Sequence, residues 1–377
     1  MFKVVRSAFM FAIGVGVAAS PILSVAQSNS STGAVFVMTN NADKNQVIAY
    51  ERAADGSLGQ SQAYDTDGRG SGGTSDPLES QGSLTLSQDH SLLFAVNAGS
   101  GTVSTFSVHK SNLSLLGKTP SFGVQPSAVA EYQGLVYVLN SGGPGSVVGF
   151  RLDFGGQLMQ IPNSTAFLTG TTSGGASLAF SPNGRILLVT ERVANNIDAF
   201  TVKADGTLTP IVVNSNPAPG SFSVTFAPNG AAIVSETGPA DATNGSAISS
   251  YEVKANGTLS SISQSVPTLA AGNCWNVVAP DGTRVYVSNS ASNSISGFNI
   301  GKNGTLTPIA GAVVGNLPAG SHNVDIAITA NGKYVYTIDS QSGNIGIFEV
   351  NSDGTLTSLG QSGDLPKSVG FNGIAAL

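Results

Sequence analysis

The chain has 377 residues, of which 47 are glycine, and only 10% of its residues carry a charge. Its formal net charge is −6 and its 16 lysines and arginines are scattered, which argues against a surface for nucleic acid or for an anionic membrane. This composition favours many short strands joined by tight turns, and the negative net charge fits a basic partner or a neutral small molecule better. We expect a monomer that needs no cofactor.

The first 26 residues have the features of an export signal. Lys3 and Arg6 give a positive start, and residues 8–19 form an apolar run that is too short and too rich in glycine to span a membrane comfortably. The sequence therefore predicts a mature protein that starts near Gln27 and is secreted or periplasmic.

A turn motif of the type Asp-Gly-Thr-Leu recurs seven times after this signal. The copies begin at Asp55, Asn112, Gly155, Asp205, Asn256, Asn303 and Asp353. Their leucines lie 43 to 57 residues apart, which is the repeat length of propeller blades. Asp-Gly and Asn-Gly pairs tolerate positive φ angles, so each copy predicts a tight turn between two strands.

Seven apolar strands that end in a polar residue give the same count independently. The polar residues are Asn40, Asn97, Asn140, Glu191, Glu236, Asn289 and Asp339. Each is followed by an aromatic-containing strand and then by the turn, and a further apolar strand precedes each. The sequence thus predicts an all-β, seven-bladed propeller of four-stranded blades, with residues 27–377 as one domain.

The two ends of the predicted propeller share one blade. The chain enters at a second strand, and residues 368–377 form an innermost strand with no strand after them. We therefore expect residues 368–377 to pair with residues 34–39 and close the ring, which removes its free sheet edges.

Two insertions interrupt the repeats, at residues 65–80 and 237–246. Both are expected to be surface loops. Simple loop growth and a role in covering a site explain them equally well.

Candidate site residues cluster where second strands end and innermost strands begin, because a propeller brings these points together at one face, which we call the mouth. Most polar strand ends are expected to bind the following turn. Glu191 and Glu236 are longer and are candidates for catalysis, together with His322, which is either a general base or a buried hydrogen-bonding partner.

Further polar and aromatic residues at the mouth are candidates for binding a substrate. They are Ser127, Ser177, Arg192, Trp275, Asn276, Asn323 and Asp325. The single cysteine, Cys274, forms no intramolecular disulfide, and it is either a small buried residue or a nucleophile.

The repeated strand and turn motifs resemble the lactonase family of seven-bladed propellers, which includes bacterial 6-phosphogluconolactonase and the fungal carboxymuconate lactonizing enzymes. The resemblance covers essentially the whole mature chain. It implies an active-site glutamate at Glu191, which is present. The Arg-His pair of the family falls on Ala176 and Ser177, a further histidine on Ser127 and an arginine on Ser290, so four of five expected groups are replaced.

The leading hypothesis is an exported lactonase-like protein that hydrolyses or forms a lactone of a sugar acid or an aromatic-derived acid. The alternative is a non-catalytic propeller that binds a ligand or protein at its mouth. A third hypothesis places a calcium ion among the oxygen ligands of the mouth, although calcium-dependent propeller lactonases have six blades; we expect no metal.

Overall fold

The computed structural model describes Met1, residues 32–239 and residues 242–377. The expected export signal, apart from Met1, and the expected mature start at Gln27 lie outside the described residues. So do two residues of the second insertion. No helix in the described part of the chain is long and apolar enough to cross a membrane.

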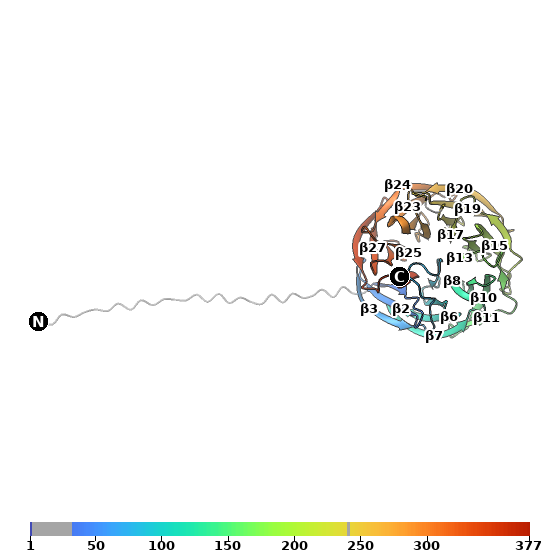
Figure 1. Ribbon diagram of the computed structural model, residues 1–377, viewed down its shortest axis with the longest axis horizontal. Helices are drawn as coiled ribbons and strands as arrows, with labels where there is room; N and C mark the ends of the chain where they lie inside the picture. Colours follow the sequence, from blue (N-terminus) through green and yellow to red (C-terminus); the bar gives the residue numbers. More distant parts are fainter. Residues whose placement is uncertain (2–31, 240–241) are drawn as a thin grey trace.

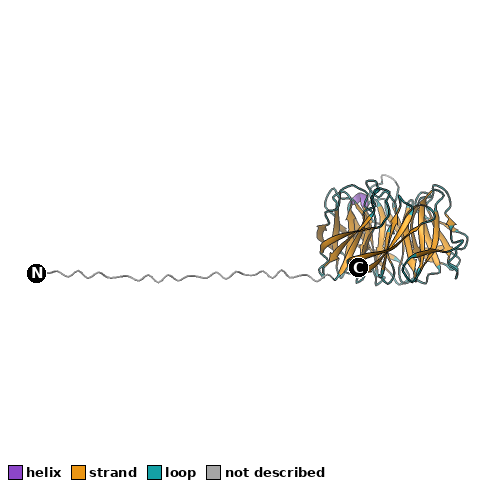
Figure 2. Cartoon of the chain, turned by 90° about the horizontal axis from the view of Figure 1, so that it is seen from below, coloured by secondary structure: helices purple, strands orange, loops and turns teal. Residues whose placement is uncertain are grey.

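Seven antiparallel sheets form a closed ring, with β8, β13, β17 and β25 among the strands nearest its centre (Figure 1). The strands run through the thickness of this disc, and loops cover both faces (Figure 2). The predicted seven-bladed propeller is therefore confirmed.

Each blade has four strands ordered from the innermost outward; they are consecutive in the chain except in blade 1, whose innermost strand comes from the C-terminus. Blade 1 is β29 (Ile374–Ala376), β1 (Gly33–Met38), β2 (Gln46–Arg52) and β3 (Leu58–Asp65); blade 2 is β4 (Leu84–Leu86), β5 (Leu92–Asn97), β6 (Thr102–His109) and β7 (Asn112–Pro120). Blade 3 is β8 (Val124–Tyr132), β9 (Leu135–Gly142), β10 (Ser146–Leu152) and β11 (Leu158–Gln160), with β12 (Ala166–Phe167) also paired to β10.

The remaining four blades follow the same plan. Blade 4 is β13 (Gly175–Phe180), β14 (Ile186–Glu191), β15 (Asn196–Thr201) and β16 (Val212–Ser215); blade 5 is β17 (Ser221–Phe226), β18 (Ala232–Glu236), β19 (Ala247–Val253) and β20 (Leu259–Pro267). Blade 6 is β21 (Asn273–Val278), β22 (Arg284–Asn289), β23 (Ser294–Ile300) and β24 (Leu306–Asn316); blade 7 is β25 (Asn323–Ile328), β26 (Tyr334–Asp339), β27 (Asn344–Val350) and β28 (Leu356–Ser362). One short 3-10 helix, η1 (Ser290–Ser292), follows β22.

Buried tyrosines link second strands to turns in blades 3 and 7. The hydroxyls of Tyr137 and Tyr336 donate hydrogen bonds of 2.7 Å to the carbonyls of Gly206 and Gly56, each in the turn of the next blade around the ring. Both glycines have positive φ angles, 83° and 84°, which favour glycine at these turns. Each bond satisfies a buried phenol and fixes one blade against its neighbour.

One of the seven predicted turns differs in detail. Asn112 already belongs to β7, and the turn is made by Lys110 and Ser111, with Lys110 at a φ angle of 55°. The second motif copy has no glycine, and its turn lies at Lys110 and Ser111, before the motif begins.

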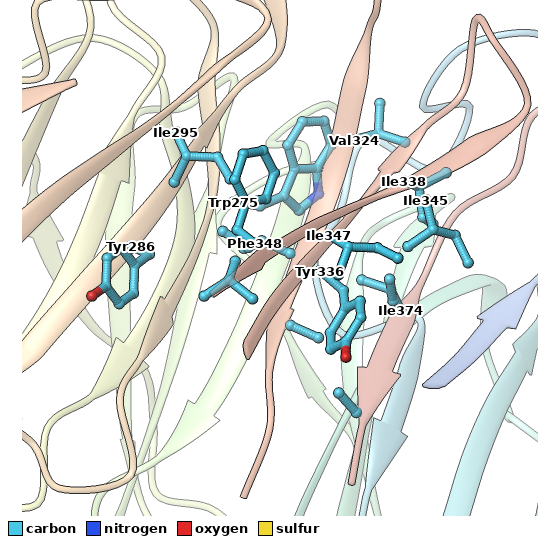
Figure 3. Packing of buried hydrophobic residues seen from close by; sticks show 14 of the residues in the cluster. Trp275, Tyr286, Ile295, Val324, Tyr336, Ile338, Ile345, Ile347, Phe348 and Ile374 are labelled. Carbon is cyan, nitrogen blue, oxygen red and sulfur yellow. The ribbon is translucent and has the colours of Figure 1, made fainter. Parts of the chain in front are cut away.

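The ring closes as predicted. Strand β29 pairs antiparallel with β1, and Ala375 lies opposite Phe36. Ile374 packs in the same hydrophobic cluster as Tyr336, Ile345 and Trp275, which joins blades 6, 7 and 1 (Figure 3). The last strand of the chain thus completes the first blade.

Candidate active site at the mouth

The predicted mouth exists, because the end of each second strand lies beside the start of an innermost strand. Asn273 pairs with Asn289, and Asn323 with Asp339. All seven polar strand ends are fully buried. Their side chains are therefore held within the blades.

Blade 2 shows the role that these strand ends play. The Nδ2 of Asn97 donates to the hydroxyls of Thr102 at 3.1 Å and Ser104 at 2.8 Å on the next strand. Asn289 makes the same two kinds of contact in blade 6. The side chain ties the second and third strands together at the mouth.

Glu191 has the corresponding place in blade 4, with a different set of partners. One oxygen accepts a 2.7 Å hydrogen bond from the backbone N–H of Thr169, and the other accepts from the Thr169 hydroxyl and, at 3.1 Å, from Asn196. Burial, and then the neighbouring Glu191, raise the pKa of Asp198 to about 8. Glu191 and Asp198 therefore form a buried carboxyl pair in which Asp198 keeps its proton at neutral pH.

The other two candidate catalytic residues lie in blades 5 and 7. Glu236 is fully buried; its Oε1 accepts a 2.6 Å hydrogen bond from Ser249, its Oε2 has no partner among the described residues, and burial raises its pKa. His322 is partly buried, and burial lowers the pKa of its imidazole. Among the described residues no hydrogen bond or ion pair joins Glu191, Glu236 and His322. The structure holds each of them in its own blade.

The first insertion covers the mouth. It forms a segment of residues 66–83, which we call the strap, that runs from β3 to β4 across the centre of the ring. The Ser80 hydroxyl donates to the carbonyl of Ser127 in blade 3 at 2.9 Å. The indole N–H of Trp275 in blade 6 donates to the carbonyl of Ser80 at 3.0 Å. The strap therefore joins blades that are not neighbours in the ring.

Gln81 makes the most complete set of strap contacts. Its backbone N–H donates to the carbonyl of Ala176 at 3.0 Å. Its side-chain amide donates to the Asn276 carbonyl at 2.7 Å and accepts from the Asn276 N–H at 3.0 Å. The Asn276 side chain donates in turn to Ser223 and Ser235 of blade 5. Two predicted substrate-binding residues, Trp275 and Asn276, thus bind the chain itself.

Two carboxyl groups, one of them in the strap, interact electrostatically near the start of blade 7. Asp76 of the strap accepts a 2.6 Å hydrogen bond from Asn372, and Asp325 accepts from the backbone N–H groups of Ile326 and Ile374. Burial raises the pKa of Asp325 to about 7 and, helped by Asp325, raises that of Asp76 as well. Burial likewise raises the pKa of the Cys274 thiol, which leaves it protonated and poorly nucleophilic.

One accessible ion pair lies near Cys274. Arg192, on the turn after β14, contacts the carboxylate of Glu79 in the strap, and their side chains are 29% and 59% exposed. Both charges affect the pKa of the Cys274 thiol in blade 6. Glu79 and Asp76 were missed from the sequence because the insertion carries no repeat that would place them.

The last two predicted binding residues, Ser177 and Asn323, are buried. Ser177 is 2% exposed and lines a cavity of about 280 Å³ together with Gln81 of the strap. The Nδ2 of Asn323 donates to Ser288 and to the Ser294 carbonyl. Within the described ranges, no group of three or more His, Cys, Asp or Glu side chains is placed to hold a metal ion.

Comparison with known proteins identifies the architecture. Residues 25–272 and 245–371 match a family model described as lactonase, seven-bladed β-propeller. No protein of curated function is significantly similar in sequence.

Solved structures share the fold at low sequence identity. A candidate 6-phosphogluconolactonase of Bacteroides uniformis is 22% identical, with a TM-score of 0.67 over 91% of this chain and 99% of that one. The periplasmic gluconolactonase of Pseudomonas aeruginosa is 16% identical, with a TM-score of 0.69 over 91% and 98%. Identities this low support the fold alone.

Proposed function

Because this chain belongs to the lactonase family of seven-bladed β-propellers, we propose that it hydrolyses a small lactone at its mouth with a rebuilt pair of groups. Glu79 is the base that activates water, and Arg192 is the cation that stabilises the oxyanion. Lactones of sugar acids and aromatic-derived acids are the substrate class, and the names of the solved relatives support this choice.

A single observation carries the proposal. The family's Arg-His pair falls on Ala176 and Ser177, and the strap binds at this point through the bond from Gln81 to the Ala176 carbonyl. The strap also carries Glu79, which forms an ion pair with Arg192. A carboxylate and a guanidinium therefore stand together at the mouth where the family's own charged pair is missing.

The chemistry requires the ion pair to open. Exposed ion pairs contribute only about 0.2–1 kcal/mol, so a substrate carbonyl oxygen can replace Glu79 on Arg192 at little cost. Glu79 then takes a proton from water while the water oxygen bonds to the carbonyl carbon. Arg192 stabilises the resulting oxyanion, the ring C–O bond breaks, and the leaving oxygen takes the proton from Glu79. Lactone and water become a hydroxy acid.

The test is a pH-stat hydrolysis screen of sugar-acid and aromatic-acid lactones with matched variants. We expect Glu79→Gln to lower kcat by roughly 100-fold or more and Arg192→Gln by a similar factor. Glu51→Gln, which changes an exposed carboxylate on β2, is the control and should leave turnover unchanged. Activity that survives Glu79→Gln but is lost in Glu191→Gln would move the chemistry to the buried carboxyl pair.

The second candidate is a non-catalytic propeller that binds a ligand or protein at the mouth. The hydrogen bonds that fill the mouth with the strap favour it. Wild-type protein that is folded and hydrolyses none of the lactones would support this candidate, and calorimetric titration with the hydroxy acids would then test for binding.

We also propose that the protein is exported. The evidence is the positive start and apolar run of residues 1–26. Mass spectrometry of the protein recovered from the periplasm or the medium should give an N-terminus near Gln27, whereas an intact N-terminus in the cytoplasm would contradict export.

A further inference from the structure

The face of the ring opposite the mouth has two adjoining clefts. The larger has a volume of about 620 Å³ and lies between the turns of blades 4 and 5. The second, of about 520 Å³, continues it toward blade 6, and the two share Asn229, Gly230 and Val253. Both volumes lie within the roughly 300–1,000 Å³ that is usual for small-molecule sites.

Three side chains in the larger cleft have free hydrogen-bond donors. Arg185 and Lys254 line it, and neither side chain has an ion-pair or hydrogen-bond partner among the described residues. The Oδ1 of Asn183 accepts from Ser181 and from the Arg185 N–H, which leaves its Nδ2 free to donate. A ligand that satisfies this set must supply acceptors, and two cations favour an anion.

The charge of this region contrasts with that of the whole chain. The protein has 22 acidic and 16 basic residues. Three cations, Arg185, Lys254 and Lys302, nevertheless line the clefts, against one carboxylate, Glu252, which lies in the second cleft only. An anionic group is therefore best placed in the larger cleft, and an uncharged part of the ligand in the second.

Two exposed prolines complete the larger cleft. Pro182 and Pro228 occupy equivalent positions in the turns of blades 4 and 5. Their apolar C–H groups, beside amide and cationic donors, offer contacts to the C–H face of a sugar ring that carries a carboxylate. We propose that this cleft binds a carboxylated carbohydrate, at a site separate from the mouth and independent of any chemistry there.

Isothermal titration calorimetry of the full chain tests this proposal with trigalacturonate as the probe, and with maltotriose and inorganic phosphate as comparison ligands. We expect trigalacturonate to bind and maltotriose, which is neutral, to bind at least tenfold more weakly. The affinity for trigalacturonate should fall as ionic strength rises.

Variants locate the binding. Arg185→Gln and Lys254→Gln should each weaken trigalacturonate binding about tenfold, which corresponds to about 1.4 kcal/mol, because each removes a charge-assisted hydrogen bond. Lys203→Gln, which changes an exposed lysine outside both clefts, is the matched control and should have no effect. Glu79→Gln should also leave binding intact, which separates this site from the proposed catalytic one.

Three results would overturn the proposal. They are no binding of trigalacturonate at millimolar concentration, an equal loss of affinity in Lys203→Gln, and phosphate binding as tight as that of trigalacturonate. The last result would assign the cleft to phosphate instead of carbohydrate.

Discussion

The two faces of the ring differ in how their polar groups are bound and exposed. At the mouth the strap covers the chain and binds Ser127, Ala176, Trp275 and Asn276. The polar groups left without a partner there are buried, among them oxygens of Asp198 and Glu236. At the opposite face, the donors of Arg185 and Lys254 have no partner among the described residues.

Both faces are built from the same repeat, so the difference comes from what is added to it. The mouth has an inserted segment, whereas the opposite face has only the short turns of the repeat and the side chains they carry. A propeller can therefore fill one face and leave the other open without changing its blades.

Removal of residues 368–377 should have the largest effect, because it damages both faces together. It deletes β29 and exposes the inner edge of β1, where Phe36 is fully buried. We expect a loss of at least about 5 kcal/mol in unfolding free energy, or failure to fold. Circular dichroism melting measures this, and an unchanged cooperative transition would show that the ring does not depend on its closing strand.

A change in the strap should affect the mouth alone. Gln81→Ala removes two hydrogen bonds to the backbone of Asn276 and should destabilise the chain by about 2 kcal/mol. Hydrogen exchange should rise in residues 66–83 and stay unchanged at the opposite face. Gln88→Ala, at an exposed glutamine whose side chain has no hydrogen-bond partner in the described part of the chain, is the control. Equal effects of the two variants would contradict a structural role for the strap.

The pH dependence of stability should also come from the mouth. The folded chain keeps the Asp198 proton up to about pH 8, whereas the unfolded chain releases it near the ordinary pKa of 3.8. The unfolding free energy therefore falls as pH rises between these values, by at most about 1.4 kcal/mol per pH unit for this group. Asp325, with its pKa raised to about 7, adds to the same slope below pH 7.

Asp198→Asn removes this titration and keeps the shape of the side chain. The gain in unfolding free energy should be larger at pH 8 than at pH 5, by up to about 4 kcal/mol. Urea denaturation at several pH values measures the difference. A gain that is the same at every pH would assign the slope to other groups.

The smallest effect on stability is expected at the opposite face. Arg185→Gln and Lys254→Gln break no ion pair or hydrogen bond of a described residue, so the unfolding free energy should change by less than about 0.5 kcal/mol. Thermal melting without ligand checks this. A larger loss would mean that these cations support the fold and are not reserved for a ligand.

The ring could be predicted from the sequence because the motifs that form its blades recur at a regular spacing. The turn copies and the polar strand ends recur at blade length, and Ala375 lies opposite Phe36 within the expected pairing. The strap could not be placed, since a glycine-rich insertion has no periodicity. Arg192 and Glu79 lie 113 residues apart, and only the closed ring brings them together.

The position of Glu191 was predicted, but its surroundings were not. Asp198 occupies a place on the third strand that serine holds in three other blades, at Ser104, Ser249 and Ser296. An acidic residue in an otherwise apolar strand is a signal that the glutamate before it has a buried partner. That comparison between blades would have indicated the carboxyl pair from the sequence alone.

The pairing of β29 with β1 also sets the order in which the molecule can be completed during synthesis. Strand β1 leaves the ribosome among the first elements, and residues 374–376 among the last. Until they emerge, the inner edge of the first blade has no partner, and it can pair with other chains. The unfinished ring is therefore most open to pairing with other chains just before residues 374–376 can join it.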